Sequence, residues 1–177
     1  SNLFGKLNFS TEFRHLFHDG RTVSFRFFGG KFLWNNIQDT SYFDYSLNRS
    51  SDYLFRYNYL GRSDNDGIYS QQFILSEGGF KSKFENPNAN DYILAANFGF
   101  SVWKWVEVYA DLGLTKNRNY KSRGFYDSGL RINLVPDYLE FYFPIQNSEN
   151  YVLNDADYFS NMRFVLTVDL NNLKQLF

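Results

Sequence analysis

The stretch YILAANFGFSVWKWVEVYADLGL (residues 92–114) decides which fold this sequence can adopt. Every second residue from Tyr92 to Val102 is aromatic or aliphatic. After a tight turn at 103–105 the alternation resumes, with Glu107 and Asp111 opposite an apolar series that ends at Leu114. Successive side chains of a β-strand point to opposite faces, so a period of two indicates strands. The stretch predicts a β-hairpin with one apolar face and one polar face.

The same alternation recurs along most of the chain. Aromatic residues make up 21% of the sequence and favour strands, and no segment of ten or more residues has a helical period. All three prolines fall in connections or at strand ends, where no hydrogen bond of a sheet is lost. The pattern predicts nine strands, at about 3–17, 23–34, 52–62, 68–80, 92–103, 106–114, 130–134, 139–143 and 163–170.

Short and long connections alternate in this reading. Tight turns are expected at 18–21, 63–67, 103–105 and 135–138, and long loops at 35–51, 81–91, 115–124 and 146–161. Asp19-Gly20 predicts a type I′ turn with both residues at positive φ, and Gly29-Gly30 predicts a β-bulge. Strict alternation of loop length is typical of outer-membrane barrels. We therefore expect an all-β, antiparallel up-and-down transmembrane β-barrel that occupies residues 1–177, with no separate soluble domain.

The polar face would then line the lumen of the barrel and the apolar face would contact lipid. Bulky aromatic residues at strand ends would form the two interfacial girdles: Trp34, Tyr92, Trp103, Trp105 and Tyr138. Charges of both signs on the polar face can pair across strands, which a buried charge needs. The expected lumen network is Lys6, Glu12, Arg14, Arg26, Arg56, Glu107, Asp111, Arg131, Glu140, Arg163 and Asp169.

Composition excludes several other classes. No run approaches 18 apolar residues, so no transmembrane helix is expected, and a net charge of -1 gives no reason to expect nucleic acid. Cysteine is absent. His15 and His18 are three residues apart and would point to opposite faces of a strand, so no metal site is predicted. No cofactor motif or nucleophile motif is present, and we expect no catalytic residue in this chain.

Two features predict additional partners: further barrel strands and lipopolysaccharide. Bacterial single-chain barrels have even strand numbers, so nine strands predict the C-terminal part of a larger barrel. The alternative is a further strand in QDTSYFDYSL (38–47) that the alternation does not mark. The run KNRNYKSR (116–123) places four cations in a predicted outer loop, where they would contact lipopolysaccharide phosphates. A solvated loop is the alternative. These candidate contacts are Lys116, Arg118, Lys121 and Arg123.

Two stretches carry a resemblance to a known family: LFRYNYLGRSDNDGIYSQQFILSEGGFK (54–81) and GLRINLVPDYLEFYFPI (129–145). They resemble the C-terminal region of large Bacteroidota cell-envelope proteins of the gluzincin, zinc-aminopeptidase-like metallopeptidase type. The resemblance implies residence in the outer membrane and a peptidase-like domain upstream of a membrane barrel. The HExxH zinc helix of such peptidases has no counterpart in these 177 residues.

Three functions are compatible with these patterns. The first is a barrel in the outer membrane of a Gram-negative bacterium that anchors a larger surface or envelope assembly. Its partners would be the lipid bilayer, lipopolysaccharide, and either upstream barrel strands or another protein of a membrane complex. The second is a pore for small solutes, and the third is a soluble lipocalin-like barrel that binds an apolar ligand.

Overall fold

The computed structural model describes residues 4–36, 43–49, 67–135 and 138–166. Within them the chain is all-β, and no helix there is long and apolar enough to cross a membrane. Seven strands form one antiparallel sheet in the order β1-β2-β5-β6-β7-β8-β9. They are β1 (Phe4–Leu16), β2 (Thr22–Asn35), β5 (Tyr92–Trp103), β6 (Val106–Lys116), β7 (Arg123–Val135), β8 (Leu139–Asn147) and β9 (Arg163–Leu166).

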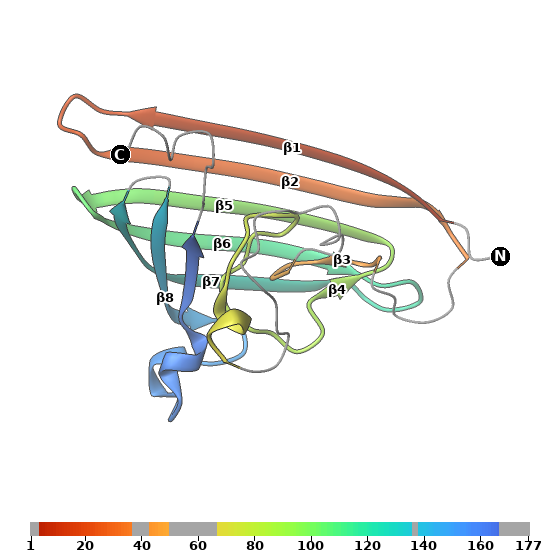
Figure 1. Ribbon diagram of the computed structural model, residues 1–177. Coiled ribbons are helices and arrows are strands. Elements are labelled where there is room, and N and C mark those ends of the chain that lie inside the picture. The colour runs from red at the N-terminus through yellow and green to blue at the C-terminus, as the bar shows by residue number, and fades with distance from the viewer. Residues whose placement is uncertain (1–3, 37–42, 50–66, 136–137, 167–177) are drawn as a thin grey trace.

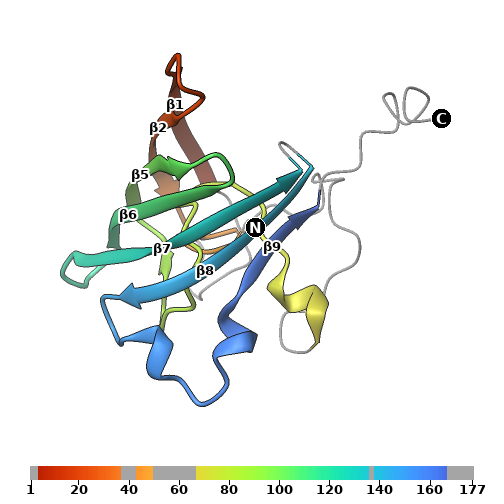
Figure 2. The same ribbon diagram turned by 90° about the vertical axis from the view of Figure 1, so that its left-hand side faces the viewer.

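The sheet curves into a half-barrel, with β1 at one edge and β9 at the other (Figures 1 and 2). Neighbouring strands run in opposite directions throughout, so the predicted antiparallel up-and-down order is confirmed for these seven strands. The short connections at 17–21 and 104–105 lie at one end of the sheet, which we call the turn end. The connection 117–122 lies at the other end, beside residues 88–91 that lead into β5, and we call this the loop end (Figure 1).

The long connection between β2 and β5 enters the concave side of the half-barrel (Figure 2). It carries the 3₁₀ helix η2 (Ile68–Gln71) and a two-stranded sheet of β3 (Tyr45–Ser46) and β4 (Asn88–Ala89). We call its described parts, 43–49 and 67–91, the insert. The 3₁₀ helices η3 (Val152–Asn154) and η4 (Tyr158–Asn161) join β8 to β9.

The hydrophobic core lies between the insert and the sheet rather than between two layers of sheet. Tyr45, Leu47 and Phe80 of the insert are fully buried. They pack with Phe28 of β2, Ile93 and Ala95 of β5, and Phe125 of β7. The insert therefore fills part of the space that the curved sheet encloses.

The strand predicted at 68–80 is wrong. Its apolar residues occupy both parities of the sequence, with Ile68 and Ile74 opposite Tyr69 and Phe73, so no single face can be buried by a strand. The segment instead forms η2 and a loop in which Glu77 and Gly79 have φ of 41° and 69°. The strand predicted at 52–62 lies outside the described residues.

Two local predictions near the first hairpin are also wrong. Asp19 has no positive φ, and only Gly20 does, at 81°. The turn is closed by hydrogen bonds from the Gly20 N–H to the Phe17 carbonyl and from the Phe17 N–H to the Arg21 carbonyl. This is a three-residue loop that ends in a left-handed glycine, which also fits the twist of a hairpin.

The register passes through Gly29 and Gly30 without a bulge and shifts near Leu33, between the pairs Gly5–Trp34 and Lys6–Phe32. Gly30 serves a different purpose. A Cβ at this position would lie 2.7 Å from the Tyr45 ring, so the glycine lets the insert approach the sheet closely.

Candidate functional site

A row of polar side chains crosses the concave face of the sheet. Antiparallel pairing places Arg26 opposite Asn97, Asn97 opposite Asp111, and Asp111 opposite Asp127. All four are buried, with Asp111 and Asp127 at 0% and 1% exposure. Because they come from four adjacent strands, their positions follow directly from the register.

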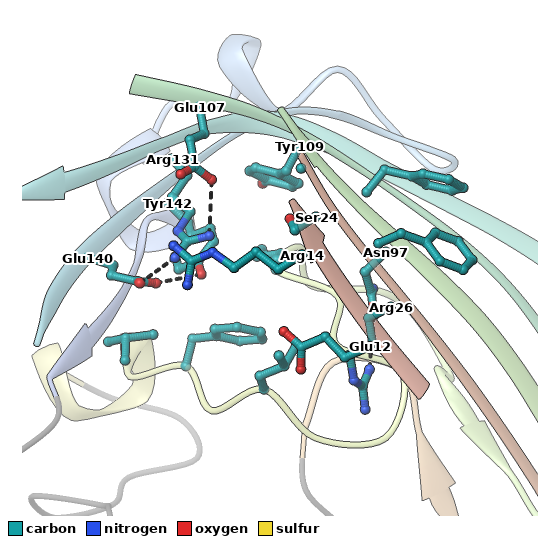
Figure 3. A pocket seen from close by; sticks show the side chains of 17 residues that line it. Glu12, Arg14, Ser24, Arg26, Asn97, Glu107, Tyr109, Arg131, Glu140 and Tyr142 are labelled. Carbon is teal, nitrogen blue, oxygen red and sulfur yellow. Dashed lines mark hydrogen bonds and ion pairs between the residues drawn. The ribbon is translucent and has the colours of Figure 1, made fainter. Parts of the chain in front are cut away.

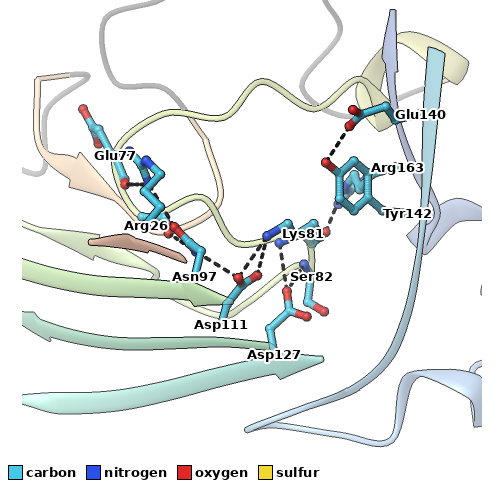
Figure 4. A network of polar contacts seen from close by, with 11 residues as sticks. Arg26, Glu77, Lys81, Ser82, Asn97, Asp111, Asp127, Glu140, Tyr142 and Arg163 are labelled. Carbon is cyan, nitrogen blue, oxygen red and sulfur yellow. Dashed lines mark hydrogen bonds and ion pairs between the residues drawn. The ribbon is translucent and has the colours of Figure 1, made fainter. Parts of the chain in front are cut away.

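Lys81 of the insert is the counter-ion of Asp111 in this row (Figure 4). Its Nζ lies 2.9 and 2.8 Å from the two oxygens of Asp111. Asp127 Oδ2 accepts the backbone N–H groups of Lys81 and Ser82 at 2.8 and 2.6 Å. Arg163 of β9 donates from Nε to the Lys81 carbonyl at 3.0 Å. Lys81 thus joins the insert to the sheet through both its side chain and its backbone.

The other end of the row holds the insert through its backbone. Asn97 donates from Nδ2 to Asp111 and to the Gly78 carbonyl, both at 2.9 Å. Arg26 donates from Nη1 to Asn97 Oδ1 at 2.9 Å and to the Glu77 carbonyl at 2.8 Å. Buried polar groups stabilise a fold only when they are hydrogen-bonded. Each residue of this row has such a bond, largely through the insert, and Asp127 Oδ1 is the one side-chain oxygen of the row without a partner among the described residues.

A second charged cluster lies nearer the turn end, on β6, β7 and β8 (Figure 3). Arg131 donates from Nη1 to Glu107 Oε2 at 3.1 Å and from Nη2 to Glu140. Tyr142 donates to Glu140 Oε2 at 2.8 Å, and Asn133 donates to Glu107 Oε1 at 2.9 Å. One guanidinium therefore bridges two carboxylates that neighbouring side chains also hold.

A cavity of about 300 Å³ separates β1 from this second cluster. Its wall contains Arg14 and Ser24 on one side and Arg131, Glu140 and Tyr142 on the other (Figure 3). Phe73 and Lys81 of the insert also line it. The cavity is small and charged, and its described cations and anions lie close to one another. Its wall combines these charged groups with apolar side chains such as Phe73, Leu75 and Val165.

Tyr45 joins the insert to the first hairpin. Its hydroxyl contacts the Leu7 carbonyl at 3.2 Å and Asn8 Oδ1 at 2.5 Å. Burial, together with the nearby Glu77 carboxylate, raises the pKa of Tyr45 to about 12. The phenol therefore keeps its proton at neutral pH and remains a hydrogen-bond donor.

The structure brings most of the predicted lumen residues onto the concave face. Arg26, Glu107, Asp111, Glu140 and Arg163 are buried there, and the Arg131 side chain is 20% exposed. Glu12 and Arg14 point to the same side and line the cavity, although β1 leaves them exposed. Lys6 lies over the Tyr45 ring at 4.6 Å. Arg56 and Asp169 lie outside the described residues.

Sequence reasoning missed Lys81 and Asp127, which join the insert to the buried polar row of the sheet. Asp127 has the parity of Arg131 on the same strand, so extending the alternation of 130–134 backwards by four residues finds it. Lys81 has no such signal, because it begins the predicted loop 81–91, which has no periodicity.

The predicted cations of 116–123 divide into two groups. Lys116 points to the convex side, opposite Tyr92, and Arg118 and Lys121 are exposed in the connection between β6 and β7. Arg123 has the inward parity of Phe125, and its guanidinium lies 5.0 Å from the centre of that ring and 3.7 Å from Glu149. Arg123 therefore does not belong with the other three.

The predicted aromatic girdle residues lie near strand ends. Trp103 and Trp105 flank the turn-end connection between β5 and β6, where they are 75% and 58% exposed. Trp34 lies near the loop end of β2 and covers Gly5. Tyr92 begins β5, and Tyr138 precedes β8 and is half-buried.

No group of three metal-ligating side chains occurs among the described residues. His15 lies on β1, where its ring stacks with Phe13 and meets Phe17 edge-on, and His18 follows in the turn. Comparison of the chain with known family models, with curated proteins and with solved structures finds no match. The function is therefore argued from the residues themselves.

Proposed function

We propose that this chain forms part of the wall of an outer-membrane β-barrel and acts as a structural anchor for a larger surface or envelope assembly. The observation that carries the proposal is an inverted distribution of polarity. Beside its apolar core, the inside of the half-barrel buries a set of charged side chains, and large apolar side chains cover the outside. A water-soluble protein buries the second kind and exposes the first.

The convex face is continuous and apolar across the sheet. One row runs through Phe25, Phe98 and Ala110, and the next through Val23, Phe100, Val108, Leu130 and Phe143. Phe98, Phe100 and Val108 are each about two-fifths exposed. From these rows toward the loop end, as far as the level of Leu94, the described outward positions carry no charged residue. A patch this large indicates contact with an apolar surrounding.

The dimensions of the face fit a lipid bilayer. The strands from β1 to β7 contain 11 to 14 residues, apart from the two-residue β3 and β4 of the insert. A transmembrane strand needs about 9–11. Outward apolar residues of β5 extend from Leu94 to Val102, which is roughly 27 Å at about 3.4 Å per residue. A tilt of about 40° reduces this to roughly 20 Å, near the apolar band of about 25 Å seen in outer-membrane barrels.

The interior favours an anchor over the two other functions. The insert occupies the concave side and is tied to it through Lys81, Asn97 and Arg26, which opposes a wide water-filled channel. An apolar-ligand barrel needs an apolar lumen, whereas this one contains Asp111 and Glu107 at 0% and 6% exposure.

The open sheet supports a wall that further strands complete. β1 pairs with β2 on one side, and every residue from Leu7 to Leu16 is exposed. Since all neighbours are antiparallel, the two edge strands β1 and β9 run in the same direction. An odd number of further strands would close the sheet without a parallel pair. The larger barrel and the upstream peptidase-like domain that the resemblance implies remain predictions.

Membrane residence is tested by fractionation and gel migration. Expressed in a Gram-negative host, the chain should remain in the outer-membrane fraction and require detergent for extraction. Its folded form should migrate differently from the heated form on a gel. A monomer that is soluble without detergent would contradict the proposal.

The anchor function is tested separately in planar bilayers. We expect no regular conductance steps from the reconstituted chain, because the insert fills the concave side. Regular conductance steps that are absent from control bilayers without protein would favour the pore and contradict the anchor.

A further inference from the structure

Some cations of the described loop end have a carboxylate partner and others do not. Lys31 lies 2.9 Å from Asp91, and Arg123 lies 3.7 Å from Glu149. Arg118 and Lys121 have no carboxylate within ion-pair distance among the described residues. Their positive charges are therefore available to an anion from outside the chain.

The turn that carries these two cations has a defined shape. The Asn117 side chain accepts the Asn90 N–H at 2.9 Å and donates to the Asn88 carbonyl at 3.0 Å. Asn90 Oδ1 accepts the Arg118 N–H at 2.8 Å. The left-handed residue Asn119, with φ of 67°, completes the reversal. These hydrogen bonds between the insert and the turn fix the backbone that carries Arg118 and Lys121.

The turn lies directly beyond the apolar convex face. Lys116 is outward and opposite Tyr92, and the next outward pair toward the middle of the sheet is Leu94 with Leu114. Lys116 also donates to the Tyr120 carbonyl, and the Tyr120 side chain is 73% exposed. Cations and an exposed tyrosine therefore stand at the rim of a surface that we propose contacts lipid tails.

The described turn-end connections contain one cation without a carboxylate partner, Lys104. Arg21 is paired with Asp19, and Lys104 lies 5.7 Å from the Trp105 ring. The two ends of the sheet therefore differ in the cations left without a carboxylate: two in the connection between β6 and β7, and one in the connection between β5 and β6.

We propose that the 116–121 turn binds the phosphate groups of membrane lipids, through Arg118 and Lys121 with support from Lys116. This inference rests on the proposed membrane location. A guanidinium matches phosphate geometry with two parallel hydrogen bonds, and an ammonium adds a mobile point charge. The phosphate of a lipid lies just beyond its tails. One lipid molecule can therefore place its phosphate against the cations of the turn and its tails against the apolar convex face.

The test uses the full chain in neutral detergent mixed with equimolar phosphatidic acid and phosphatidylcholine. Lipid that co-purifies with the protein is quantified by mass spectrometry. We expect phosphatidic acid to be enriched, and the double variant Arg118→Gln/Lys121→Gln to lose enrichment on the order of 5-fold per cation removed. Lys104→Gln, at the opposite end, should retain it. Sodium phosphate at matched ionic strength should displace less lipid than added phosphatidic acid does.

Two results would overturn the inference: equal lipid ratios in the parent chain and the double variant, or equal losses in the double variant and Lys104→Gln. Full displacement by inorganic phosphate would reassign the site to the free anion. Gel migration and detergent dependence are measured on the same samples. If they show a membrane protein without phosphatidic acid enrichment, only this inference fails, whereas a soluble monomer contradicts the proposed function itself.

Discussion

Asp111 and Leu112 are neighbours on β6, yet the charged residue is 0% exposed and the apolar residue is 54% exposed. The same contrast repeats on the adjoining strand β5, where Asn97 is 7% exposed and Phe98 is 44% exposed. The two faces of one sheet thus follow opposite rules. The concave face is covered by the insert through both polar and apolar contacts, and the convex face leaves its apolar side chains exposed.

The largest expected effect is on the concave face. Lys81→Met removes the ammonium that lies between the oxygens of Asp111 and leaves a buried carboxylate without its counter-ion. Breaking a buried ion pair in this way costs about 3–5 kcal/mol. We expect a loss of this size in the free energy of unfolding by urea, measured in detergent micelles.

The control for this prediction is Lys104→Met, the same change at a lysine beside the β5–β6 turn, which should stay within about 0.5 kcal/mol. Lys81→Met/Asp111→Leu should recover much of the loss, since it removes both charges. Equal stability of Lys81→Met and Lys104→Met would show that the pair does not hold the insert.

A smaller effect is expected where the insert packs against the sheet. A Cβ at Gly113 would lie 2.8 Å from both the Phe80 ring and Leu47. Gly113→Val should therefore destabilise the fold by about 1–3 kcal/mol through overpacking. Gly124→Val is the matched control, because nothing lies within 4 Å of a Cβ added there. Urea unfolding of both variants makes the comparison, and equal midpoints would place the insert away from Gly113.

The smallest effect is expected at the first turn, which belongs to neither face. The hydrogen bond from the Arg21 side chain lowers the pKa of Asp19 below its ordinary value of 3.8. A lowered pKa in the folded state means that the contact stabilises the fold above about pH 3.8 and is lost as the pH falls through the lowered value. Since both side chains are exposed, solvent screens the contact.

Asp19→Asn should accordingly leave the urea midpoint at pH 7 nearly unchanged, and the small difference from the parent chain should vanish at low pH. A large difference at pH 7, or one that grows on acidification, would contradict this account of the turn.

The alternation of residue types predicted the sheet well where one face carries all the apolar groups. It located β1, β2 and β5 through β9, their antiparallel order and the parity of Arg26, Glu107 and Asp111, because a period of two assigns every side chain of a strand to one face. It failed over 68–80, since the insert is surrounded by sheet and buries residues of both parities. No local pattern marks a loop such as this one, whose conformation depends on distant partners such as Asp111 and Asp127.

The candidate site divides in the same way. Residues on strands, such as Arg131 and Glu140, could be assigned to one face, and their pairing follows from the register. The partner that the insert brings, Lys81, could not be found, because it lies 30 residues from Asp111 in the sequence and its contact depends on the path of a non-repetitive loop.

The central claim is that the convex face contacts lipid, and one substitution on each of two strands tests it most directly. Leu112 and Leu134 are similarly exposed, at 54% and 57%, but Leu112 lies in the middle of β6 and Leu134 lies at the turn end of β7. In lipid vesicles we predict that Leu112→Arg lowers the free energy of unfolding by about 2–4 kcal/mol and Leu134→Arg by about 0–1 kcal/mol. If both changes stay within about 0.5 kcal/mol, as at exposed sites of water-soluble proteins, the convex face does not contact lipid and the account is wrong.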